Sequence, residues 1–258
     1  MRFEILGPLR VIDADGVTFP SARKIEILLV SLLIRADQVV ATDALIGEIW
    51  REAVPRRATA ALYVYVSQLR KFLRRPGDKG SPIVTQAPGY HLVVGSAELD
   101  TRQFTTLLDL GRRHLRASRY EEAAGCLEDA SALWRGPIAP ELRGGPIISG
   151  FSSWLAETQL ECTEMLIDAY LHLGRHRELI GRLSTLTTEH PLHEAFHRQL
   201  MLALYRSDRQ AEALDVYRAA RHTLNTELGL EPCHSLQELQ QSILQASRLD
   251  VSVRTVAA

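Results

Sequence analysis

The chain has 258 residues, of which 46% are hydrophobic and 24% are charged. This composition is typical of a folded globular protein and excludes a disordered chain. The longest uncharged apolar stretch, residues 27–34, is far shorter than the roughly 20 residues of a membrane-spanning helix, and residues 1–4 do not open a secretory signal. We therefore expect a cytoplasmic protein with no membrane segment. Its three widely spaced cysteines suggest neither a disulfide framework nor a zinc knuckle.

The formal net charge of −1 conceals a marked asymmetry along the chain. Residues 1–96 hold 13 Lys and Arg against 9 Asp and Glu, whereas residues 97–258 hold 17 against 22. The positive charge is concentrated between Arg51 and Lys79, where eight basic residues face two acids. Such a local excess indicates an anionic partner for this segment.

Periodicity predicts a sheet, three helices and a hairpin in the first part of the chain. Short alternating runs in the first twenty residues predict three antiparallel strands. Apolar residues at helical spacing then predict a helix from Ser21, a second over residues 41–50 and a third over residues 58–73. Thr42 or Asp43 is the expected N-cap of the second helix. Residues 83–94 alternate again around Pro88-Gly89, which predicts the hairpin.

From Leu99 onward the sequence predicts helices and no convincing strand. Four helix starts are marked by a cap residue three positions before an acid or amide, namely Asp100, Ser118, Ser207 and Ser235. Leu179, Leu183 and Leu186 recur 34 residues later as small or apolar residues, namely Ala213, Tyr217 and Ala220. A period of 34 built on paired helices is typical of tetratricopeptide repeats, although generic amphipathic helices share the shorter steps.

These patterns predict a mainly α protein of two domains and a tail. Residues 1–96 are expected to form an α+β winged helix-turn-helix, and residues 97–248 an all-α, tetratricopeptide-like repeat domain. Residues 249–258 are the expected tail.

The third expected helix has two different faces on a helical wheel. Leu62, Val66, Leu69 and Leu73 form an apolar stripe that predicts burial. The opposite face is small, polar and basic and contains no acid; it carries Arg57, Ala60, Val64, Ser67, Gln68, Lys71 and Arg74. A helix in the major groove of DNA, about 12 Å wide, needs small residues, amides and cations, and a valine suits a thymine methyl group. The alternative is a solvated basic face.

The neighbouring elements favour the DNA interpretation. A helix-turn-helix needs a first helix that braces the second across the DNA backbone, and residues 41–57 supply this helix and its connection. The hairpin after the third helix would then reach a neighbouring minor groove or phosphate as a wing. Arg56 and Arg57 stand at the N-terminus of the third helix, where backbone N–H groups favour a phosphate.

Several runs of residues in both halves of the chain resemble a known family. The run Tyr63–Lys71, together with Gly89-Tyr90, resembles the OmpR-type winged helix of the Streptomyces antibiotic regulatory protein family. The second half resembles the bacterial transcriptional activation domain of the same family in Leu133–Pro137, Leu173–His176, His190–Glu194, Leu200–Arg206 and Glu227–Pro232. The resemblance covers nearly the whole chain.

The resemblance implies a transcriptional activator of secondary-metabolite (antibiotic) biosynthesis genes, with no enzymatic activity and no cofactor. Such an activator binds direct repeats in double-stranded DNA near the promoter −35 element, with protomers in head-to-tail order. It recruits RNA polymerase through its sigma or alpha subunits. Larger relatives carry an ATPase module, but no G-x-x-x-x-G-K-[ST] loop occurs in this sequence, which implies the short form of the family.

The resemblance also assigns roles to residues. It implies that Val64, Ser67 and Gln68 read bases, and that Arg57, Arg70 and Lys71 hold the DNA backbone. Further expected DNA contacts are Arg56, Tyr63, Arg74 and, in the wing, Gln86. Gln86 stands where relatives often have arginine, which puts a charged minor-groove contact in doubt. The loop Arg51–Arg57 is the expected polymerase contact.

Two alternatives from other classes remain at this point. The first is a helical-repeat interaction module whose basic helix contacts an acidic protein. The second is a zinc hydrolase, because residues 193–197 fit H-E-x-x-H, with His190 or Glu212 as a third ligand. A first-turn acid beside a helix dipole explains Glu194 without a metal, and a pattern with three fixed positions often arises by chance. His172 and His176 also stand four residues apart and are expected at the surface.

Overall fold

The computed structural model describes residues 1–14, 16–74, 80–95, 98–136 and 144–245. Contacts divide the chain into two compact units, one of residues 1–106 with 130–159 and one of residues 107–129 with 160–258. Residues 130–159 thus group with the N-terminal unit, although the sequence places them in the second domain. The boundary at residue 96 stays a prediction, and the expected tail lies outside the described residues.

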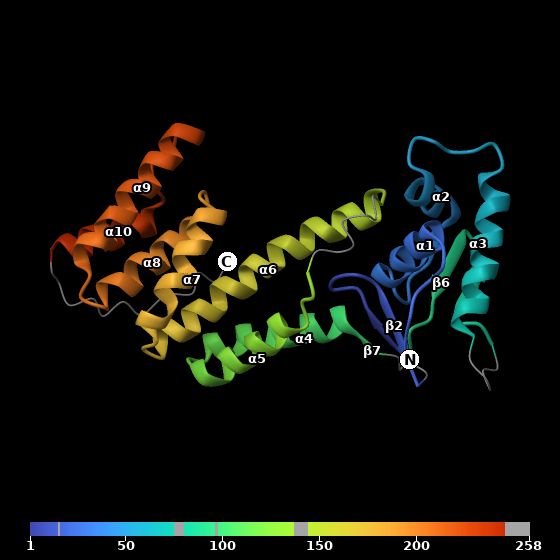
Figure 1. The fold of residues 1–258 in the computed structure, drawn as a ribbon, viewed down its shortest axis with the longest axis horizontal. Coiled ribbons are helices and arrows are strands. Elements are labelled where there is room, and N and C mark those ends of the chain that lie inside the picture. Colours follow the sequence, from blue (N-terminus) through green and yellow to red (C-terminus); the bar gives the residue numbers. More distant parts are fainter. Residues whose placement is uncertain (15, 75–79, 96–97, 137–143, 246–258) are drawn as a thin grey trace. The chain divides into compact units, whose positions relative to one another are not determined.

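The N-terminal unit begins with a four-stranded sheet (Figure 1). Its strands are β1 (Arg2–Glu4), β2 (Arg10–Asp13), β3 (Gly16–Thr18) and β7 (Glu98–Leu99), in the order β3-β2-β1-β7. The three predicted antiparallel strands are confirmed. The two-residue β7 was not predicted, because so short a segment has no alternation to detect; it pairs parallel to β1, with Phe3 opposite Leu99.

Three helices follow this sheet, at α1 (Arg23–Ile34), α2 (Thr42–Trp50) and α3 (Ala58–Leu73). Their apolar faces form one core with residues of this sheet, such as Phe3, and of the hairpin that follows α3, such as Leu92. The expected N-cap of α2 is wrong. Ala41 occupies the cap position without a side-chain bond, and the Thr42 hydroxyl donates instead to Pro88 O at 3.1 Å.

The predicted hairpin is confirmed as β5 (Ile83–Gln86) and β6 (Gly89–Leu92). It belongs to a second sheet, β4-β6-β5, in which β4 is the two-residue strand Val40–Ala41 before α2. Glycine is required at position 89, because a Cβ there would lie 1.9 Å from Val40 O. The hairpin is therefore held directly against the start of α2.

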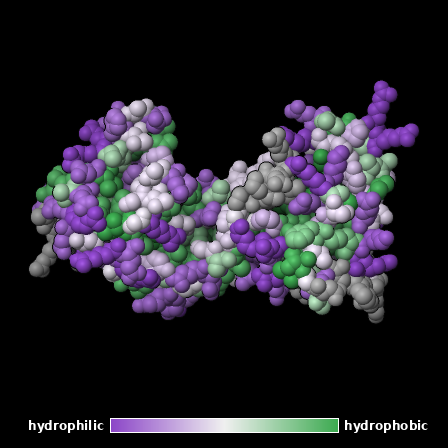
Figure 2. Space-filling model, in the orientation of Figure 1, coloured by the Kyte–Doolittle hydropathy of each residue, from purple (hydrophilic) through white to green (hydrophobic). Residues whose placement is uncertain are grey.

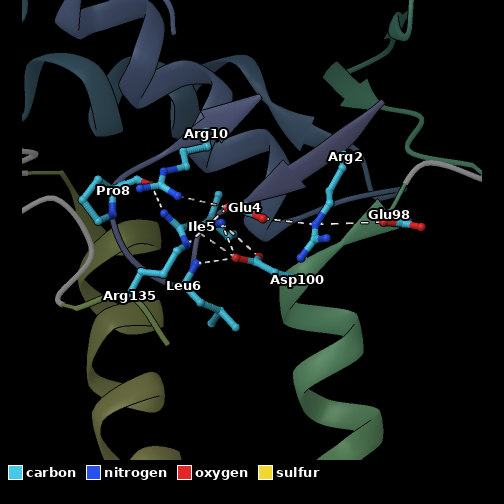
Figure 3. Close-up of polar contacts among 9 residues, drawn as sticks. All are labelled: Arg2, Glu4, Ile5, Leu6, Pro8, Arg10, Glu98, Asp100 and Arg135. Carbon is cyan, nitrogen blue, oxygen red and sulfur yellow. Dashed lines mark hydrogen bonds and ion pairs between the residues drawn. The ribbon is translucent and has the colours of Figure 1, made fainter. Parts of the chain in front are cut away.

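A buried hydrogen-bond network closes the N-terminal sheet against residues that are distant in sequence (Figure 3). Asp100, the first residue of α4 (Asp100–Arg116), is 2% exposed and accepts hydrogen bonds from Ile5 N and Leu6 N at 2.8–2.9 Å. Arg135 Nε lies 3.3 Å from Glu4 Oε2, and Arg135 Nη2 lies 3.6 Å from Asp100 Oδ2. Asp100 was expected to cap its own helix; its carboxylate binds the end of β1 instead.

A second buried carboxylate joins α2 to α6 (Pro146–His172). Glu48 is 1% exposed, and its oxygens accept hydrogen bonds from Ile147 N and Ile148 N, both at 2.9 Å. A carboxylate at a helix N-terminus satisfies N–H groups that have no partner within the helix. Residues 144–159 are thereby attached to the helix that precedes α3.

The second unit contains antiparallel helix pairs (Figure 1). Its helices are α7 (His176–Glu189), α8 (Glu194–Tyr205), α9 (Gln210–Leu228) and α10 (His234–Leu244), with most of α5 (Tyr120–Ala132) and parts of α4 and α6. Helix α8 packs against α7, α9 and α10. Leu179, Leu183, Ala213 and Ala220 are buried in its core, with Leu186 and Tyr217 packed against them. The repeated positions therefore lie in this core or against it, and the mainly α fold is confirmed.

The serines that were expected to cap helices do not do so. Arg209 is the N-cap of α9 and Cys233 that of α10, both without a side-chain bond. The buried Ser207 hydroxyl donates instead to Ala203 O, in the last turn of α8, at 2.7 Å. Ser118 lies two residues before α5 with a φ of 56°.

A polar cluster lies inside the second unit, between α6 and α8. The Gln199 amide is fully buried and donates to Asp168 Oδ1 at 2.7 Å, and Arg198 Nη2 lies 4.0 Å from the same oxygen. Burial raises the pKa of Asp168 to about 6, against a partial lowering by Arg198 and Gln199. Burial is therefore the larger effect on this carboxyl group.

This pKa predicts how stability depends on pH. Between about pH 4 and pH 6 the folded chain holds a proton on Asp168 that the unfolded chain has lost, so the contribution of this group to stability falls as the pH rises. Asp168→Asn keeps an acceptor for Gln199 but does not titrate. We expect the variant to be more stable than the parent at pH 7.5, by about 1–2 kcal/mol in urea unfolding, and to lose this advantage near pH 4. An equal difference at both pH values would contradict the assignment.

Candidate nucleic-acid interface

Helix α3 presents the two faces that its sequence predicts. Leu62, Val66, Leu69 and Leu73 are 0–2% exposed and form the inner face. On the opposite side Tyr63 is 57% exposed and Val64 is 53% exposed. Thr59, Ala60, Ser67, Gln68 and Lys71 are exposed on the same helix. The structure therefore holds this polar face in solvent while the apolar stripe fixes the helix in the core.

The exposed side of α3 is cationic. Arg56, Arg57, Lys71 and Arg74 are all exposed, and no acidic residue occurs from Ala58 to Arg74. Arg56, Arg57 and Lys71 form no ion pair within the part of the chain that the structure describes. Hydrophilic side chains project from the edge of the N-terminal unit that α3 forms (Figure 2). This charge is available to an anionic partner.

Arg70 differs from the other cations of α3. It is half-buried, and its Nε donates to Ile83 O at 3.1 Å while its Nη2 donates to Thr85 Oγ1 at 2.7 Å. Its guanidinium also lies 5.9 Å from the centre of the Tyr90 ring. Arg70 therefore connects α3 to the hairpin, a contact that the helical wheel gave no means to foresee.

The hairpin has the form of a wing beside α3. Gln86 is exposed where β5 ends, so the structure places this expected site residue at the hairpin turn. Tyr90 is 6% exposed, and burial raises its pKa above the ordinary value. Tyr90 therefore packs within the wing and is not presented to solvent.

The connection between α2 and α3 is exposed throughout. Every residue from Arg51 to Arg57 lies at the surface, including Val54 at 50% exposure. Trp50, at the end of α2, stacks on Tyr65 of α3 with ring centroids 5.7 Å apart. This stacking holds the two helices together beneath a loop that is open to a partner.

Comparison with known proteins identifies the family. The family described as bacterial transcriptional activator domain matches residues 99–244, and that described as transcriptional regulatory protein, C terminal, matches residues 21–92. The regulatory protein DnrI of Streptomyces peucetius is 33% identical over 95% of this chain and 93% of its own length. The chain belongs to the Streptomyces antibiotic regulatory protein family.

Other members of the family are longer than this chain. The regulatory protein AfsR of Streptomyces coelicolor is 39% identical over 95% of this chain but only 24% of its own length. EmbR of Mycobacterium tuberculosis is 35% identical over the whole of this chain and 67% of its own length. A solved structure of EmbR in complex with a low affinity phosphopeptide matches with a TM-score of 0.90 at 33% identity, and covers 96% of this chain. This chain spans about two thirds of EmbR, 66% of the solved chain.

Membership of the Streptomyces antibiotic regulatory protein family makes the chain a transcriptional regulator and not an enzyme. The contacts of the H-E-x-x-H segment agree with a structural role. His193 lies before α8 with its Nε2 3.3 Å from Glu164 Oε2, and His197 Nε2 lies 2.9 Å from Pro191 O. Glu194 accepts a hydrogen bond from Cys233 N at 2.6 Å. Among the described residues no group of three or more His, Cys, Asp or Glu could hold a metal ion.

The structure corrects one further sequence expectation. His172 and His176 were expected at the surface, but both are half-buried, and burial together with Arg206 lowers their pKa values. No helix in the described ranges is long and apolar enough to cross a membrane.

Proposed function

We propose that this regulator binds double-stranded DNA by placing α3 in the major groove. The observation that carries the proposal is the exposed, acid-free face of α3, held in place by a fully buried apolar stripe. A helix of this kind fits a groove about 12 Å wide between two phosphate walls. Helix α2 and its connection to α3 provide the brace that a helix-turn-helix requires.

The residues of α3 divide by the chemistry of DNA that they suit. Val64, Ser67 and Gln68 face the base edges, where an amide can pair with adenine and a valine can contact a thymine methyl group. Arg57 and Lys71 contact phosphates, with Arg56 and Arg74 as further cations and Tyr63 against sugar or phosphate. Gln86 contacts the neighbouring groove or backbone from the wing.

The regulator acts, in this proposal, as an activator of secondary-metabolite genes in the cytoplasm. Two or more protomers bind direct repeats near the −35 element in head-to-tail order, because direct repeats place successive protomers in the same orientation. The exposed loop Arg51–Arg57 contacts RNA polymerase, at a sigma or alpha subunit. The names of DnrI and AfsR as regulatory proteins support a role of this kind.

The two classes of contact predict different effects of substitution. A phosphate contact releases a counterion whatever the sequence, so Lys71→Ala should weaken binding to all duplexes alike and lower the slope of log K against log salt by about one. Gln68→Ala should weaken binding to the target repeat by about 1–3 kcal/mol and relax the base preference at one position. Fluorescence anisotropy at several salt concentrations, on target and scrambled duplexes, measures both effects.

Arg177→Ala is the matched control for loss of charge. Arg177 is exposed on α7, in the second unit, so its removal should leave both the affinity and the slope unchanged. If Lys71→Ala and Gln68→Ala also bound like the parent, α3 would not be the DNA-binding element. Weak, sequence-independent binding by the parent would favour an acidic protein partner instead.

A further inference from the structure

Arg70 is placed to control the wing rather than the DNA backbone. Its side chain leaves α3 at the edge of the exposed face and reaches β5, which is 13–15 residues away along the chain. One guanidinium nitrogen binds a backbone carbonyl and another binds the Thr85 hydroxyl. Two donors of a rigid planar group thereby fix β5 in both position and orientation.

The two strands of the wing are held in different ways. Strand β6 pairs with β4, and Thr42 N and Oγ1 both donate to Pro88 O, at 3.2 and 3.1 Å. Strand β5 is an edge strand whose strand neighbour is β6. Arg70 supplies hydrogen bonds from α3 to β5, so the edge of the wing is attached to the recognition helix itself.

We propose that Arg70 is a positioning residue that sets the wing relative to α3, so that both contact DNA as one body. This role rests on the proposed function and deepens it. The family resemblance implies a DNA phosphate as the partner of Arg70, whereas the structure gives Arg70 partners in the wing. The β4–β6 pairing and Arg70 together then set the distance between the groove entered by α3 and the backbone or groove reached by Gln86. The Tyr90 ring beneath the guanidinium limits its movement.

Salt dependence distinguishes positioning from phosphate contact. A residue that neutralises a phosphate contributes about one unit to the salt slope, whereas a residue that orients other groups contributes affinity without counterion release. We therefore expect Arg70→Ala in the full chain to weaken binding to the target duplex by about 5- to 20-fold, as for loss of hydrogen bonds to a charged group, with the slope unchanged. Lys71→Ala, one residue further along, is the matched control in which the slope falls.

Thr85→Val tests the same contact from the other side. It removes the acceptor of Arg70 Nη2 and preserves the size and branching of the side chain. We expect a smaller loss of affinity, about 3-fold, and no further loss when Thr85→Val is added to Arg70→Ala, because both act on one hydrogen bond. Amide hydrogen exchange of residues 83–92 in the free variants should be faster than in the parent, while α3 is unchanged.

The possible results separate this inference from the proposed function. If the parent binds the duplex and Arg70→Ala lowers the salt slope by about one, Arg70 is a phosphate contact and the positioning role is wrong. Additive losses for the two substitutions, or unchanged exchange in the wing, would also overturn it. A parent chain that binds no duplex at all would reject the proposed function, and the positioning role on DNA with it.

Discussion

The burial of one face of α3 determines what the rest of the N-terminal unit can do. Four side chains at 0–2% exposure, Leu62, Val66, Leu69 and Leu73, fix the rotation of this helix about its own axis. Each such side chain contributes about 1.5–3 kcal/mol on burial, far more than an exposed cation contributes through ion pairs. The apolar stripe therefore decides which residues of α3 face solvent.

Buried carboxylates complete the unit by binding backbone N–H groups. Asp100 binds the end of β1, and Glu48 binds the N-terminus of α6. Each contact joins segments more than 90 residues apart, and each carboxylate would be costly to bury without these donors. As a result one folded unit contains the helix that precedes α3, the sheet beside it and residues 144–148. The stability of the DNA-binding part then depends on residues far beyond its own sequence segment.

Local patterns predicted the elements well, and the distant contacts not at all. The 3.6-residue period predicted the bounds of α3 and both its faces. Residues that are buried on one side of a helix recur at this spacing, so the sequence alone shows them. The caps failed for a physical reason: Asp100 and Ser207 have polar groups that other partners satisfy, at Leu6 N and Ala203 O. The same reason explains Arg70, which the sequence shows only as one more cation on the helix. Its direction depends on where the hairpin lies, and periodicity does not contain that information.

Chemical labelling of the outer face of α3 tests most directly whether this face binds DNA. A Ser67→Cys chain, with the exposed Cys233 replaced by serine, carries a thiol in the middle of this face. We expect rapid maleimide labelling in the free protein and strong protection in the presence of a duplex that contains the target repeat. A scrambled duplex at high salt should protect much less. Labelling of the introduced thiol that is slow in the free protein, or equally fast with and without the target duplex, would contradict the claim that this face binds DNA.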